Sequence, residues 1–151
     1  MIEGVRIKHL TRHVDDRGWL MEILRDDDEI FTAFGQVYVS AAFPGVVKAW
    51  HCHQRQTDSF CVLVGNAKIG LFDDRQASAT RGQAHALVAG ELNPIVVQIP
   101  PLVWHGFMAL EGRTALVLNV PNAHYNRDQP DELRRDPFDP DIPFEWCTQG
   151  G

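Results

Sequence analysis

The sequence predicts an all-β protein of one domain, built as a sandwich or a closed barrel. Short apolar segments bounded by glycine or proline recur about every ten residues, which is typical of both architectures. No long amphipathic helical pattern interrupts these segments. A chain of 151 residues, with 44% hydrophobic and 23% charged residues, is long enough to form one globular domain with a substantial core.

The strand candidates begin with residues 35–43 (GQVYVSAAF), where apolar and polar residues partly alternate. Residues 59–75 contain two apolar runs around Gly65-Asn66, and this pair predicts a hairpin because both residues tolerate positive φ. Three further strands are expected, at 94–100, 103–110 and 114–121. The acidic segment 24–31 is expected to form a short helical turn or an acidic loop.

The C-terminal part of the chain, residues 121–151, is polar and rich in proline. It nevertheless contains four aromatic residues: Tyr125, Phe138, Phe144 and Trp146. Leaving these side chains in water is unfavourable, so we expect an ordered extension packed on the barrel. The whole chain, 1–151, is therefore expected to be a single domain.

The charge of the chain excludes some partners. A net charge of −6 and the lack of a Lys or Arg run argue against binding nucleic acid or an anionic membrane. A phosphate-bearing small molecule remains possible, because it needs only one or two local cations. No apolar run is long enough for a membrane span or a signal peptide, so the expected compartment is the cytoplasm.

Three histidines are the first functional candidates. His51 and His53 lie one residue apart, and alternate side chains of a strand share a face. If that face is the barrel interior, both imidazoles enter a cavity that His105, on or beside another strand, can also reach. A concave apolar pocket with a few polar groups is typical of a ligand site. Ordinary buried or surface histidines remain the alternative.

The stretch around these histidines resembles the first motif of the cupin superfamily. That motif runs Gly, five residues, His-x-His, an acidic residue and a second Gly, and it matches Gly45, His51, His53, Asp58 and Gly65. The acidic residue is Asp where the superfamily has Glu. The resemblance implies a small jelly-roll β-barrel that opens onto one cavity.

The second cupin motif is matched more loosely. Pro100 and His105 fit it, whereas Leu102 and Ala109 replace its Gly and Asn. In metal-binding cupins, the equivalents of the four residues His51, His53, Asp58 and His105 hold a divalent transition metal, and this donor set suits such an ion. Asp is one methylene shorter than Glu, which weakens this metal alternative because metal–oxygen bonds are short.

Four segments in order resemble the dTDP-4-dehydrorhamnose 3,5-epimerases of the RmlC type. They are DDRGWLMEI (15–23), IPPLVWHGF (99–107), the stretch around Tyr125, and DPDIPFEW (139–146). The resemblance implies inversion of carbons beside a 4-keto group through an enolate, without a metal or other cofactor. It implies His51 as the base, Asp139 as its orienting carboxylate and Tyr125 as the acid on the opposite face.

The same resemblance implies a nucleotide-sugar ligand and a homodimer. Arg17 and Glu22 match nucleotide-contacting positions that serve the neighbouring subunit, and strand residues from Val5 to Leu10 can pair with a partner sheet. His105 is implied to line the sugar pocket. His53 is expected to be its neighbour there.

The chain departs from the family at two substrate-binding positions. Lys48 replaces an Arg, and strand alternation places it opposite His51 unless a local bulge intervenes. Asp58 stands where the family has a Lys, so an anion occupies the expected position of an enolate-stabilising cation.

The spacing of His51 and His53 resembles instead the dTDP-sugar 3,4-ketoisomerases, which are metal-free cupins. The sequence thus favours an isomerase of a nucleotide-linked 4-keto-6-deoxy sugar, with 3,5-epimerisation in deoxysugar or surface polysaccharide biosynthesis as the first choice. Two alternatives stay open: a metal-dependent cupin enzyme, and a sugar-nucleotide-binding cupin without catalysis.

Overall fold

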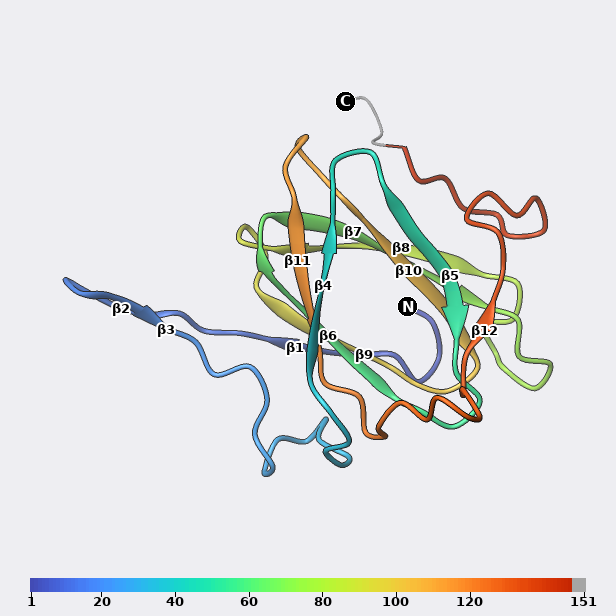
Figure 1. The fold of residues 1–151 in the computed structure, drawn as a ribbon, viewed down its shortest axis with the longest axis horizontal. Coiled ribbons are helices and arrows are strands. Elements are labelled where there is room, and N and C mark those ends of the chain that lie inside the picture. Colours follow the sequence, from blue (N-terminus) through green and yellow to red (C-terminus); the bar gives the residue numbers. More distant parts are fainter. Residues whose placement is uncertain (148–151) are drawn as a thin grey trace.

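The computed structural model describes residues 1–147, which form two five-stranded antiparallel sheets and a separate two-stranded hairpin (Figure 1). The strands are β1 (Arg6–His9), β2 (His13–Asp15), β3 (Gly18–Leu20), β4 (Tyr38–Ala42), β5 (Val47–Cys52), β6 (Asp58–Val64), β7 (Asn66–Asp73), β8 (Ala84–Gly90), β9 (Ile95–Ile99), β10 (Val103–Ala109), β11 (Ala115–Asn119) and β12 (Leu133–Arg134). This confirms the all-β prediction. Within the described residues, no helix is long and apolar enough to cross a membrane.

The two sheets face each other across a hydrophobic core. The first sheet has the order β1-β9-β6-β11-β4 and the second has the order β12-β5-β10-β7-β8. Alternate side chains of both sheets fill the space between them, among them Phe60, Ile69, Leu71, Val97 and Phe107. Strands β4 and β5 belong to different sheets, and residues of both line the cavity described below.

The hairpin predicted for residues 59–75 is wrong. Strands β6 and β7 lie in different sheets and pair with different neighbours. Gly65 joins them with φ +69°, and a Cβ at this position would lie 2.6 Å from the carbonyl oxygen of Thr114. The Gly-Asn pair therefore marks a corner where the chain passes from one sheet to the other, which requires the same backbone freedom as a hairpin turn.

Three other segments were predicted incompletely or differently from the sequence. Strand β8 was not predicted, although it pairs with β7 along its whole length. Strand β1 pairs with β9 of the same chain, whereas the sequence suggested pairing with a partner sheet. Residues 24–31 form turns and bends without a helix.

The C-terminal segment packs against the outer face of the second sheet. β12 pairs with β5, and Ile142 and Trp146 are buried in a cluster with Trp50 and Phe72. Gly70 leaves the room for this contact, because a Cβ there would lie 2.6 Å from the Trp146 ring. We therefore propose that residues 121–151 are a packed extension of the same domain; residues 148–151 of this prediction lie outside the described part of the chain.

The first testable prediction concerns this extension. Trp146→Ala is expected to lower the free energy of unfolding by about 3–5 kcal/mol, because it removes a buried indole from the cluster. The ring is 5% exposed, lies 4.9 Å from the Trp50 ring between centroids, and donates its N–H to the Pro137 carbonyl at 3.0 Å. Urea denaturation followed by circular dichroism measures the change.

Phe138→Ala is the matched control, because Phe138 belongs to the same segment but is 74% exposed. It is expected to change the free energy of unfolding by less than about 0.5 kcal/mol. Equal, small effects of the two substitutions would mean that the extension contributes nothing to the folded core.

Candidate active site

A cavity of about 400 Å³ opens between β4 and β11 on one wall and β5 and β10 on the other. Six of its lining residues supply the polar and aromatic groups used below: Tyr38, Lys48, His51, Phe60, Asn119 and Arg134. A pocket of this size, lined by both apolar and polar side chains, suits a sugar-sized ligand.

His51 is the histidine that faces this cavity. It lies on β5, and its ring meets the ring of His105 edge to face, with centroids 4.3 Å apart. Burial holds the pKa of His51 well below its ordinary value of 6.5, and the neighbouring His105, His53 and Arg134 lower it further, while Asp58 opposes them. His51 is therefore a neutral imidazole at cellular pH, the form that accepts a proton.

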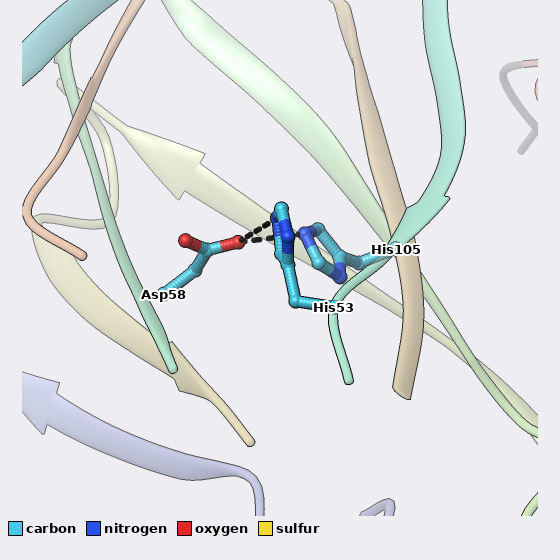
Figure 2. Close-up of side chains that lie close together, drawn as sticks. All are labelled: His53, Asp58 and His105. Atoms are coloured by element: carbon cyan, nitrogen blue, oxygen red, sulfur yellow. Dashed lines mark ion pairs between the residues drawn. The ribbon is translucent and has the colours of Figure 1, made fainter. Parts of the chain in front are cut away.

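Asp58 is a buried carboxylate at the centre of the polar groups behind the cavity. Figure 2 shows its Oδ2 facing two imidazoles, with His53 Nε2 at 3.2 Å and His105 Nε2 at 3.0 Å. Its Oδ1 accepts hydrogen bonds from Gln56 Nε2 at 2.8 Å and Asn119 Nδ2 at 2.9 Å. Burial raises the pKa of Asp58, but the contacts with His105 and His53 together outweigh it and hold the pKa well below its usual range.

His105 Nε2 approaches Asp58 Oδ2 to 3.0 Å. Neither His105 Nε2 nor Asp58 Oδ2 has a partner with hydrogen-bond geometry among the described residues, although the two atoms are within hydrogen-bond distance. The imidazole is aimed by its other nitrogen, because His105 Nδ1 donates to the carbonyl of Val103 at 2.9 Å. His105 therefore presents Nε2 to the carboxylate.

His53 is fixed in the same way from the other side of Asp58. Its Nδ1 donates to the carbonyl of Asp131, and the carboxylate of Asp131 accepts the backbone N–H groups of residues 54–56. Burial lowers the pKa of His53, but the bond to Asp58 and its charge outweigh burial and raise the pKa. The protonated form of His53 is thereby favoured beside the Asp58 carboxylate.

The same group of residues fits a metal ion. The ligand atoms of His53, Asp58 and His105 lie within 4.8 Å of one another, and both imidazoles donate Nδ1–H to backbone carbonyls, as metal-bound histidines commonly do. His51, the fourth residue of the cupin metal set, is not part of this group. A divalent ion held by these three residues would supply a Lewis acid behind His51.

Lys48 enters the cavity through a bulge in β5. The pairing of β10 with β5 joins His105 to His51 and then Phe107 to Lys48, so one residue of β10 faces two of β5. Lys48 lines the cavity and its Nζ donates to Ser40 Oγ of β4 at 2.9 Å. The local bulge required to bring Lys48 to the side of His51 is therefore present.

Four of the sequence-predicted residues lie away from this cavity. The carboxylate of Asp139 pairs with Arg135, with Nε and Oδ2 at 2.7 Å, and lines a different pocket beside Trp146. Tyr125 is 51% exposed and does not line the cavity. The other two, Arg17 and Glu22, belong to or follow the β2–β3 hairpin, which projects from the barrel, and they pair there with Asp15 and Arg25 (Figure 1).

The sequence reasoning missed several polar residues of the site. Tyr38 and Asn119 line the cavity, while Gln56 and Asp131 support the Asp58–His53 pair. Asn119 ends the apolar run ALVLN, and in the structure burial alternates along this strand so that Asn119 lies in the core. A buried amide at such a position must find hydrogen-bond partners, which marks it as part of a polar network.

Comparison with known proteins shows which family the chain resembles. The model of the polysaccharide biosynthesis C-terminal domain matches residues 13–133. The spore coat polysaccharide biosynthesis protein SpsL of Bacillus subtilis is 40% identical over 149 residues, covering 99% of each chain. The probable low-salt glycan biosynthesis epimerase Agl13 of Haloferax volcanii is 40% identical over 140 residues, covering 91% of this chain and 89% of the relative.

Solved structures agree with these relatives. A dTDP sugar isomerase from Desulfovibrio desulfuricans superposes with a TM-score of 0.91 at 33% identity, covering 99% of this chain and 94% of the other. The fold alone is shared with two dTDP-4-dehydrorhamnose 3,5-epimerases at 22% and 20% identity, with TM-scores of 0.83 and 0.86. The chain therefore belongs to the polysaccharide biosynthesis C-terminal domain family and has the RmlC-like cupin fold of the sugar-nucleotide epimerases.

Proposed function

We propose that this protein is an isomerase that epimerises a nucleotide-linked 4-keto-6-deoxy sugar, with 3,5-epimerisation as the reaction, in the biosynthesis of a surface polysaccharide. The observation that carries the proposal is a neutral, partly buried His51 facing a sugar-sized cavity. The names of the relatives support it, since one is described as a probable glycan biosynthesis epimerase and a structural neighbour as a dTDP sugar isomerase. Charged nucleotide sugars do not cross lipid freely, which favours the cytoplasm as the place of reaction.

The proposed chemistry starts with proton removal. A hydrogen on a carbon beside the keto group is acidic, and His51 removes it as a general base while the electron pair moves to the ketone oxygen. The Lys48 ammonium group, which lines the same cavity, stabilises the resulting enolate oxygen. No step requires a metal or another cofactor, and we propose that the contacts of Asp58 with His53 and His105 occupy the positions that other cupins use for metal binding.

Substrate binding is assigned to cations and polar groups around the cavity. Arg134, on β12 beside His51, lies at the edge of the cavity where the diphosphate of a nucleotide sugar would leave it. His105 and His53 form the polar wall behind His51, held by Asp58.

We also propose a homodimer in which the β2–β3 hairpin reaches the neighbouring subunit. The hairpin projects from the barrel and exposes Val14, Trp19 and Leu20 to 73%, 56% and 61%. Exposed apolar side chains on a projecting hairpin favour burial against a partner. Arg17 lies at the tip of this hairpin, so the dimer is the arrangement in which it serves a nucleotide.

His51→Asn tests the base. It is expected to lower solvent deuterium incorporation into dTDP-4-keto-6-deoxyglucose by about 10²–10⁴-fold, because the proton acceptor is lost. Proton NMR in D₂O measures the exchange, and His9→Asn, at an exposed histidine, is the control that retains it. Exchange by the wild-type protein that disappears on chelation would favour the metal alternative, and tight binding of the sugar nucleotide without exchange would favour the binding alternative.

The pH dependence tests the protonation state of His51. The base must be neutral, and its pKa is lowered by burial, so kcat/KM is expected to fall on the acid side only below pH 6.5. Arg134→Gln removes a positive charge that lowers this pKa, so the acid limb is expected to move upward. An acid limb centred above pH 6.5 in the wild-type enzyme would contradict the assignment of His51 as the base.

The dimer is tested by sedimentation velocity. The wild-type protein is expected to sediment at twice the mass of one chain, whereas Trp19→Glu places a charge in the hairpin contact and yields monomers with a raised KM. Leu92→Glu is the matched control, because Leu92 is 78% exposed in the turn between β8 and β9. A monomeric wild-type protein that is fully active would overturn the cross-subunit role of Arg17.

A further inference from the structure

Inversion of a carbon needs two groups on opposite faces of the sugar. His51 removes the proton from one face, so a donor must return a proton from the other face. The sequence resemblance implies Tyr125 for this role, but Tyr125 does not line the cavity. If the proposed function holds, another residue must supply this second proton.

Tyr38 is placed on the wall opposite His51. It is the first residue of β4, in the first sheet, whereas His51 lies on β5 in the second sheet. Both side chains line the same cavity. A ligand held between the two sheets therefore has His51 on one side and Tyr38 on the other.

The hydrogen bonds of Tyr38 leave its proton available. Asn119 Nδ2 donates to Tyr38 Oη at 2.9 Å, and because an amide nitrogen only donates, the phenol oxygen is the acceptor in this bond. The phenolic O–H is thus not used by Asn119. It is free to point at a ligand in the cavity.

The orientation of Asn119 is itself determined by its partners. Its Oδ1 accepts the backbone N–H of Ser59 at 3.0 Å, and its Nδ2 also donates to Asp58 Oδ1 at 2.9 Å. Exchanging the amide oxygen and nitrogen would place two acceptors together and two donors together, so the observed orientation is the favourable one. The side chain is 1% exposed and cannot turn to water.

The environment of Tyr38 also keeps its proton in place. Partial burial raises the pKa of the Tyr38 phenol, the bond from Asn119 opposes this, and the negative charge of Asp58 raises the pKa further. The phenol therefore stays protonated at neutral pH. The Asn119 donor stabilises the phenolate that forms transiently when the proton is given up.

We propose that Tyr38 is the catalytic acid that protonates the sugar carbon on the face opposite His51. The C–H bond breaks toward His51, and its electron pair forms the enolate. The enolate then takes the Tyr38 proton at the same carbon, forming the new C–H bond, and regenerates the ketone. The Tyr38 phenolate is reprotonated by water and His51 returns its proton to water, so the cycle closes without an oxidant or a co-reactant.

The test compares Tyr38→Phe with Tyr125→Phe on dTDP-4-keto-6-deoxyglucose in D₂O. For Tyr38→Phe, we expect deuterium to enter the starting sugar with its configuration retained, because His51 still removes and returns a proton. Formation of the inverted product is expected to fall by at least about 100-fold. Tyr125→Phe is expected to leave both rates near those of the wild-type enzyme. Circular dichroism and urea denaturation verify that both variants are folded.

Each other outcome contradicts the inference in a distinct way. Inverted product formed by Tyr38→Phe at the wild-type rate would exclude Tyr38 as the acid, and selective loss of inversion in Tyr125→Phe would assign the acid to Tyr125. Equal loss of exchange and inversion in Tyr38→Phe would make Tyr38 a binding or positioning residue. A wild-type protein that neither exchanges nor inverts the sugar would overturn the proposed function itself.

Discussion

The buried carboxylate of Asp58 is the interaction on which the rest of the site depends. An ionised carboxylate that is 1% exposed is strongly unfavourable unless several donors surround it. Here His53 and His105 meet one oxygen, and Gln56 and Asn119 donate to the other. Each of these four partners helps to compensate the buried negative charge. Asp58 does not line the cavity itself, but it contacts Asn119, which does, and His105, whose ring packs against His51.

The effect of Asp58 separates two histidines that are two residues apart. His53 shares a close contact with the carboxylate, which raises its pKa despite burial. His51 has no such contact, and burial with positive neighbours lowers its pKa well below the ordinary value. Groups of the same chemistry whose environments push their pKa values apart are typical of acid–base sites. The neutral member, His51, is the one that faces the cavity.

Sequence reasoning was most successful where the signal is local. Alternation and turn residues predicted the all-β fold, and motif spacing directed attention to the histidines, because both depend on neighbours in the chain. It failed at residues 59–75, where Gly65 permits a hairpin and a corner between sheets equally well, and only the pairing of distant strands decides between them. Tyr38, Asn119 and Asp131 were missed because their partners lie far away in the sequence. Asp139 was assigned to His51 by resemblance, but Arg135 provides a nearer counter-charge.

The bulge in β5 resolves the apparent conflict of an anion at the position of an expected cation. The Asp58 carboxylate lies behind the cavity among its own hydrogen-bond donors. These donors compensate its negative charge, so that the charge acts only weakly on a ligand in the cavity. The extra residue in β5 brings Lys48 to the cavity side, where its ammonium group faces β4. Gly106 permits this, because a Cβ there would lie 2.3 Å from the Cβ of Ala49. Lys48 and His51 thus line the same cavity, which is the arrangement that the proposed enolate intermediate requires.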